Sequence, residues 1–259
     1  MSETTTPIGA LALPVRLVDV ERPWAWLAAG WRDMQAARGV SLLYGAVLMA
    51  ISFAITLGLW LLDLFYLVLP LAAGFMLVGP LLAVGLYDVS RRLEQGETPT
   101  LADALGAWRR APGPLAALGL VLMLFMLAWI RIAFLIFALF FGTAQPNWTA
   151  LIESIFFTLD GIPFLVVGSA VGAVLAIIVF AIAAVAPPMV LDRDVGALGA
   201  MATSTVAVVR NWRVMAGWGA LIVLFTAAGL ATCYIGLIVT WPLIGHASWH
   251  AYRDLVARS

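Results

Sequence analysis

The basic residues of this chain alternate with long apolar stretches in a pattern that few folds can accommodate. All 14 basic residues are arginines, and all except Arg131 lie in four clusters, at residues 16–38, 91–110, 193–213 and 253–258. The connections within each apolar region hold no Lys or Arg. Because basic residues near span ends stay on the cytoplasmic side of a membrane, the pattern predicts several membrane spans with a common orientation.

The composition favours the same class of protein. Hydrophobic residues make up 64% of the 259 residues and charged residues 11%, whereas soluble chains are about 45–50% apolar and about 25% charged. The net charge of zero gives no reason to expect a nucleic-acid partner. The single cysteine, Cys233, excludes an internal disulfide and a multi-cysteine metal site.

Six stretches contain roughly the 20 apolar residues that a spanning helix needs. They are residues 40–62, 66–86, 114–141, 162–190, 214–233 and 235–252. The connections at Asp63, at residues 142–161 and at Tyr234 are predicted to face outward, so both termini are predicted to be cytoplasmic. The expected fold is an all-α, polytopic helix bundle with six transmembrane helices in a bacterial inner membrane.

A short amphipathic segment precedes each pair of predicted spans. The segment LAAGWRDMQAARGVSLLYGAVL from Leu27 aligns with LADALGAWRRAPGPLAALGLVL from Leu101, and PLLAVGLYDVSRRL from Pro80 aligns with PLIGHASWHAYRDL from Pro242. These alignments predict three parallel repeats, each an interfacial amphipathic helix followed by a helical hairpin. An N-terminal cytoplasmic tail of residues 1–22 would then precede one integral membrane domain of residues 23–259. The units within that domain would be residues 23–95, 96–192 and 193–259.

Several of these stretches also carry a resemblance to a known family. The segments GFMLVGPLLAVGLYDVSRRLEQGE (74–97), PPMVLDRDVGAL (187–198) and WPLIGHASWHAYRDLV (241–256) resemble a family of bacterial integral membrane proteins common in proteobacteria and defined as a domain of unknown function. The resemblance implies a six-span inner-membrane protein and brings no reaction, cofactor or catalytic residue. Some relatives carry labels that refer to cytochrome c oxidase, but two histidines are too few for its haem–copper subunit.

The two histidines form one candidate site. His246 and His250 are four residues apart and so share a helix face, at a spacing that helical metal sites use. Asp88 aligns with His250 and is the third candidate metal ligand. Two alternatives to a metal site stay open. The histidines could lie at the membrane interface and bond to backbone or lipid, or they could handle protons or substrate.

Arg131 is the one charge placed well inside a predicted span. A charged side chain at this depth must either extend to the membrane–water interface or form an ion pair with an opposite charge. The candidate partners are the outward carboxylates Asp63, Glu153 and Asp160, and the alternative is that Arg131 extends to the outer headgroups.

The sequence contains no nucleotide-binding loop and no serine-hydrolase, zinc-protease or dinucleotide motif. What remains is the surface that the amphipathic segments and apolar spans offer for docking. We expect a non-enzymatic accessory, scaffold or assembly component without a cofactor. Its partners would be membrane lipids, together with other membrane proteins or a second copy of the chain. Two alternatives stay open. One is a small-molecule or lipid transporter or channel, and the other is a metal- or haem-handling protein.

Overall fold

The structure is a computed structural model that describes residues 12–142, 153 and 161–257. The regular elements of these residues are helices, apart from one isolated bridge between Val15 and Val256. Their order and bounds are α2 (Arg22–Ala36), α3 (Arg38–Leu61), η1 (Phe65–Leu67), α4 (Val68–Leu82), α5 (Val84–Glu94), α6 (Leu101–Gly106), η2 (Ala107–Arg110), α7 (Pro112–Phe141), α9 (Gly161–Ala183), α10 (Ala186–Asp192), α11 (Ala197–Arg210), α12 (Trp212–Ala231) and α13 (Leu237–Leu255).

Five helical stretches are long and apolar enough to cross a membrane. They are residues 38–61, 65–94, 112–141, 161–192 and 212–231, and they coincide with the first five stretches predicted from the sequence. The sixth predicted stretch is also a helix, α13, but it is less apolar and most of its residues are buried. Five to six helices are therefore candidates to span the membrane.

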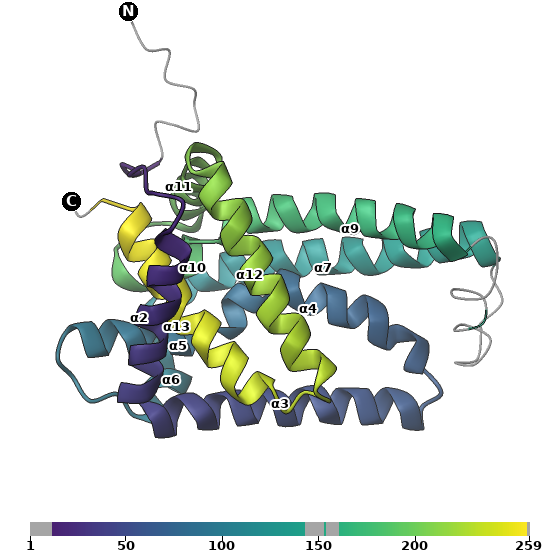
Figure 1. Cartoon of the computed structure of the whole chain (residues 1–259), viewed down its shortest axis with the longest axis horizontal. Helices are drawn as coiled ribbons and strands as arrows, with labels where there is room; N and C mark the ends of the chain where they lie inside the picture. Colours follow the sequence, from purple (N-terminus) through teal and green to yellow (C-terminus); the bar gives the residue numbers. More distant parts are fainter. Residues whose placement is uncertain (1–11, 143–152, 154–160, 258–259) are drawn as a thin grey trace, which may run out of the picture.

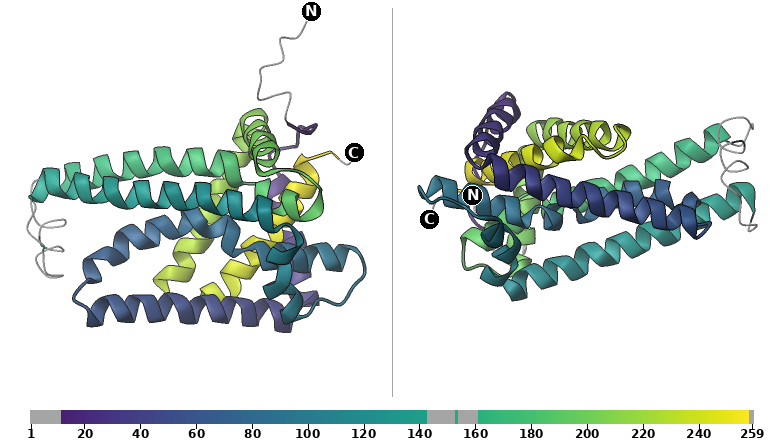
Figure 2. Two further views of the ribbon diagram at one scale, coloured as in Figure 1. Left: turned by 180° about the vertical axis from the view of Figure 1, so that it is seen from behind. Right: turned by 90° about the horizontal axis from the view of Figure 1, so that it is seen from below.

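The long and short helices are separated in space (Figure 1). The long helices α3, α4, α7 and α9 extend from one end of the molecule, while α12 and α13 run obliquely across them. Figure 2 shows α12 and α13 on one side of α3, with α7 on the other. The shorter helices gather near the two ends of the described chain, together with their connections and residues 246–257. These helices are α2, α5, α6, η2, α10 and α11. We call this region the polar end, because it holds every ion pair found among the described residues.

Prolines explain why two of the spanning stretches are interrupted. Helix α4 contains Pro80 and ends at Leu82, and α5 begins at Val84. Helix α10 follows a short break after α9 and carries Pro187 and Pro188 near its start. Proline lacks an N–H donor and its ring clashes with the preceding turn, so a helix kinks or restarts there. After each break the chain changes direction and continues into the polar end.

Each helical hairpin follows one short helical segment. Helix α2 precedes α3 and α4–α5, the α6–η2 segment precedes α7 and α9–α10, and α11 precedes α12 and α13. This order agrees with the element order of the predicted repeat, while the equivalence of the three units stays a prediction.

Helix α2 packs closely against α13. A Cβ atom at Gly30 would lie 2.6 Å from the backbone nitrogen of Ala247, so only glycine allows the two backbones to approach this closely. Trp26 of α2 stacks edge-on against Trp218 of α12, with 5.6 Å between the ring centroids. Helix α13 is therefore held inside the bundle by its neighbours.

The described part of the predicted N-terminal tail packs against the domain. The Arg16 amide donates to the Leu255 carbonyl, and the Ala257 amide donates to the Pro14 carbonyl. The buried Asn211 side chain accepts from the Val18 amide at 3.0 Å. These bonds tie residues 14–18 to the end of α13 and to Asn211, which precedes α12.

Candidate functional site

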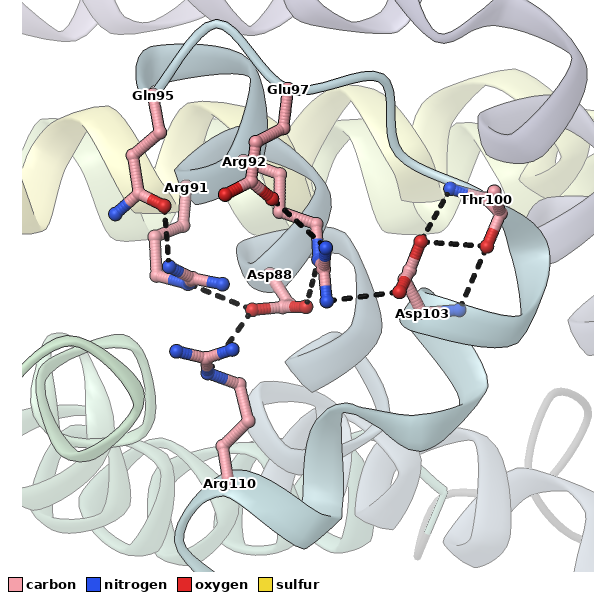
Figure 3. A network of polar contacts seen from close by, with 8 residues as sticks. All are labelled: Asp88, Arg91, Arg92, Gln95, Glu97, Thr100, Asp103 and Arg110. Atoms are coloured by element: carbon pink, nitrogen blue, oxygen red, sulfur yellow. Dashed lines mark hydrogen bonds and ion pairs between the residues drawn. The ribbon is translucent and has the colours of Figure 1, made fainter.

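Asp88 on α5 is the centre of a charged cluster at the polar end (Figure 3). Its side chain is 1% exposed, and its two oxygens accept from Arg91 Nε at 2.8 Å and Arg92 Nε at 2.9 Å. Arg91 and Arg92 can reach Asp88 because residues three and four positions apart are neighbours on a helix. Arg110 of η2 brings a third guanidinium within 3.6 Å. Three cations thus surround one buried carboxylate.

Arg92 extends this cluster to the connection between α5 and α6. Its Nη1 donates to Glu97 at 2.9 Å, and its Nη2 lies 2.9 Å from Asp103. Asp103 also forms a reciprocal capping box with Thr100 at the start of α6, as the sequence spacing indicates. Hydrogen bonds from the Thr100 side chain and backbone lower the pKa of Asp103 below its ordinary value. The connection is therefore pinned to α5 by charge.

A second network joins α5, α10 and α13. Arg253 donates to Glu94 at 2.8 Å and to Asp192 at 2.8 Å, while the Tyr252 hydroxyl donates to Asp192 at 2.6 Å. The Nε atom of Arg193 donates to the Tyr252 hydroxyl at 2.9 Å. Within this network Arg253 contacts two carboxylates, and the neutral Tyr252 hydroxyl lies between Asp192 and Arg193. The network connects the end of α10 to the last turn of α13.

His246 is fully buried between two serines from other helices. Its Nε2 lies 2.9 Å from the Ser41 hydroxyl of α3, and its Nδ1 lies 2.8 Å from the Ser90 hydroxyl of α5. A neutral imidazole has one donor and one acceptor nitrogen, so one serine accepts and the other donates. The ring therefore joins α3, α5 and α13 with both of its nitrogens satisfied.

His250 pairs with a different helix. Its Nε2 lies 2.8 Å from Asp33 Oδ2 on α2. Burial of Asp33 favours the neutral acid, but the hydrogen bonds from His250 and Ser90 and the charge interactions with the two histidines together outweigh burial and lower the pKa of Asp33 below its ordinary value. The two histidines thus connect α13 to separate elements.

The structure does not bring His246, His250 and Asp88 together as a set of metal ligands. Serines occupy both ring nitrogens of His246, Asp33 faces His250, and arginines surround Asp88. The part of the chain that the structure describes contains no group of three His, Cys, Asp or Glu side chains that could hold a metal ion. The metal hypothesis stays a prediction without geometric support.

Arg131 lies on an exposed surface of α7. Glu153 is exposed as well, and within residues 12–142, 153 and 161–257 no ion pair involves either side chain. Asp63, the second candidate partner, is exposed and belongs to none of the ion pairs found in the described ranges. Asp160, the third candidate, lies outside the described residues. The proposed pairing of Arg131 with Asp160 therefore stays a prediction.

The partners of the histidines are the residues that sequence reasoning missed. Ser41 and Ser90 are completely or almost completely buried. Ser41 lies near the start of an apolar span, and Ser90 lies between Val89 and Arg91. A small polar residue on the core side of a membrane helix commonly bonds across to another helix. This signal was present, but nothing in the sequence showed which helix would lie opposite.

The fold and the composition together define an integral membrane protein with several apolar spans. Residues 68–192, from the start of α4 to the end of α10, match a family described as predicted integral membrane protein (DUF2189). The match includes Asp88 and the three arginines around it. Neither a search of curated proteins nor one of solved structures finds a match to the chain.

Proposed function

We propose that this protein is a non-enzymatic accessory or scaffold component of its membrane, with the polar end as a rigid platform. The observation that carries the proposal is that the buried Asp88 and His246 side chains at this end are engaged by other side chains of the protein. Asp88 is held by arginines and His246 by two serines. A catalytic group needs a geometry in which a substrate atom can reach it, whereas these groups hold helices together.

Exposed apolar side chains on the short helices supply the docking surface. Tryptophan is enriched where a protein meets the headgroup layer, because its ring is apolar and its N–H is polar. The exposed tryptophans at this end and at the start of α12 are Trp24, Trp31, Trp108 and Trp212. They would contact lipid headgroups and the membrane-facing surface of a partner protein.

In this proposal the polar end faces the cytoplasm. The arginine bias supports a polar end in the cytoplasm of a bacterium, with both termini inside and three parallel repeats in the inner membrane. Reporter fusions test this directly. A fusion at Gln95 should report a cytoplasmic location, and one at Asp63 an external location. The opposite result at Gln95 would reject the orientation.

Cross-linking followed by purification in mild detergent tests the scaffold role. Wild-type protein should retain a stoichiometric protein partner, and Trp212→Ala or Trp108→Ala should reduce that yield. The matched control is Leu124→Ala, an equally exposed apolar residue in the middle of α7. If the wild type retains no partner, or if Leu124→Ala reduces the yield as strongly, the scaffold proposal is wrong.

A further inference from the structure

A hollow of about 640 Å³ opens at the polar end, between the start of α7 and the connection from α10 to α11. Two short segments line it, residues 110–112 with Pro114 and residues 190–195. Apart from two arginines and two aspartates, every lining side chain is apolar or a proline. The charged lining residues are Arg110, Asp192, Arg193 and Asp194.

Two of these four charges are already engaged by the protein. Asp192 accepts from the Tyr252 hydroxyl at 2.6 Å and from Arg253 at 2.8 Å. Arg193 donates through Nε to Tyr252 and through Nη2 to the Ala257 carbonyl. Its third nitrogen, Nη1, is buried and has no acceptor among the described residues. All three Arg193 nitrogens are therefore bonded or buried, and Arg193 forms part of the wall of the hollow.

The other two charges are open to a ligand. The Arg110 side chain is 41% exposed and lies 3.6 Å from Asp88, which Arg91 and Arg92 hold more closely. Asp194 is exposed and takes part in no ion pair or hydrogen bond found within the described ranges. The hollow therefore offers one exposed guanidinium group, that of Arg110, and one exposed carboxylate, that of Asp194, to a ligand.

The hollow lies where two candidate spans end, which is where the headgroup layer of a bilayer is expected. Helix α7 begins at Pro112, and the apolar stretch 161–192 ends at Asp192, so the lining joins the ends of two candidate spans. The start of α7 adds the positive end of a helix dipole. Basic pockets between the ends of spanning helices bind phospholipid headgroups.

We propose that this hollow binds the phosphoethanolamine headgroup of a phospholipid. The phosphate accepts from the Arg110 guanidinium group, because a guanidinium group matches phosphate oxygens in geometry and charge. The ammonium donates to the carboxylate of Asp194. A phosphatidylglycerol headgroup leaves Asp194 without a cation, and a choline headgroup has no N–H to donate. This site goes beyond the scaffold role and does not depend on it.

The test uses the intact protein, stripped of lipid in detergent and titrated in native mass spectrometry. The probes are phosphatidylethanolamine, phosphatidylglycerol, phosphatidylcholine and water-soluble glycerophosphoethanolamine. Phosphatidylethanolamine should bind most tightly of the three lipids. If the soluble headgroup binds as tightly as the lipid, the site takes a free phosphoethanolamine compound and the lipid assignment is wrong. Equal binding of all three lipids overturns the headgroup assignment.

Two variants separate the roles of the opposite charges. Asp194→Asn should weaken phosphatidylethanolamine binding about fivefold, the value expected for one charge at a membrane surface, without weakening phosphatidylglycerol binding. Arg110→Gln should weaken all three lipids by a similar factor. The control is Arg109→Gln, an exposed neighbour outside the lining. Thermal stability close to that of the wild type shows that each variant is folded. An equal loss in Arg109→Gln means that surface charge, and not the hollow, binds the lipid.

Discussion

Replacing Gly30 with alanine tests the packing that holds α13 inside the bundle. The added Cβ would lie 2.6 Å from the Ala247 nitrogen and 2.9 Å from its Cα and Cβ atoms. Backbone atoms cannot swing aside as a side chain can, so α2 must move away from α13. Overpacking of this kind costs about 1–3 kcal/mol. The higher helix propensity of alanine offsets about 1 kcal/mol of it, so we expect a net loss of stability.

The matched control is Gly217→Ala in the interior of α12, where no atom lies within 4 Å of the added Cβ. This variant should be as stable as the wild type or more stable. Unfolding of each purified variant by sodium dodecyl sulfate, followed by tryptophan fluorescence, gives the two free energies. Gly30→Ala should unfold at a lower detergent fraction than Gly217→Ala. Equal midpoints would show that the close approach of α2 and α13 is not part of the folded protein.

Three further predictions concern the polar groups of the same end. Asp88→Asn should lower the free energy of unfolding by about 3–5 kcal/mol, because it strands buried Arg91 without its counter-charge; Glu97→Gln, the exposed control, should cost at most about 1 kcal/mol in the same titration. The pKa of Asp33 is lower in the folded protein than its ordinary value of 3.8, so its contribution to stability is present above pH 4 and lost as the pH falls further. The midpoint of unfolding should therefore drop on the acid side in the wild type and drop less in Asp33→Asn, and parallel curves would contradict this. His246→Ala should cost about 1–3 kcal/mol for each serine hydroxyl that it strands, and elemental analysis of untagged wild type should find no stoichiometric zinc, copper or iron; a metal that disappears in His246→Ala would restore the metal hypothesis.

Much of the fold could be predicted because hydropathy is a local property. The stretches predicted at residues 40–62 and 114–141 correspond to helices at 38–61 and 112–141. The environment of the sixth stretch was harder to predict. Helix α13 lies inside the protein, and its polar residues bond to protein groups in place of water. An apolar run in the sequence does not show whether lipid or protein will cover it.

Three residues of the candidate site, Asp88, His246 and His250, could be singled out from the sequence, but their contacts could not. Asp88, His246 and His250 stood out because polar groups near spans are costly and need partners. Their partners come from remote parts of the chain: Ser41 is 205 residues from His246, and Asp33 is 217 residues from His250. The alignment of Asp88 with His250 suggested a shared site, whereas the structure surrounds each with different side chains.

The sequence by itself determined the class of protein, the approximate bounds of its helices and the segregation of arginines away from the apolar stretches. Those properties follow from the cost of placing charge and unbonded backbone in hydrocarbon, which acts on each segment independently. Only the tertiary structure decided that Asp88 would be held by three arginines, that serines would occupy both nitrogens of His246, and that α13 would be buried. These outcomes depend on which helices pack together, and that choice is made by close contacts such as Gly30 against Ala247, which no local pattern specifies.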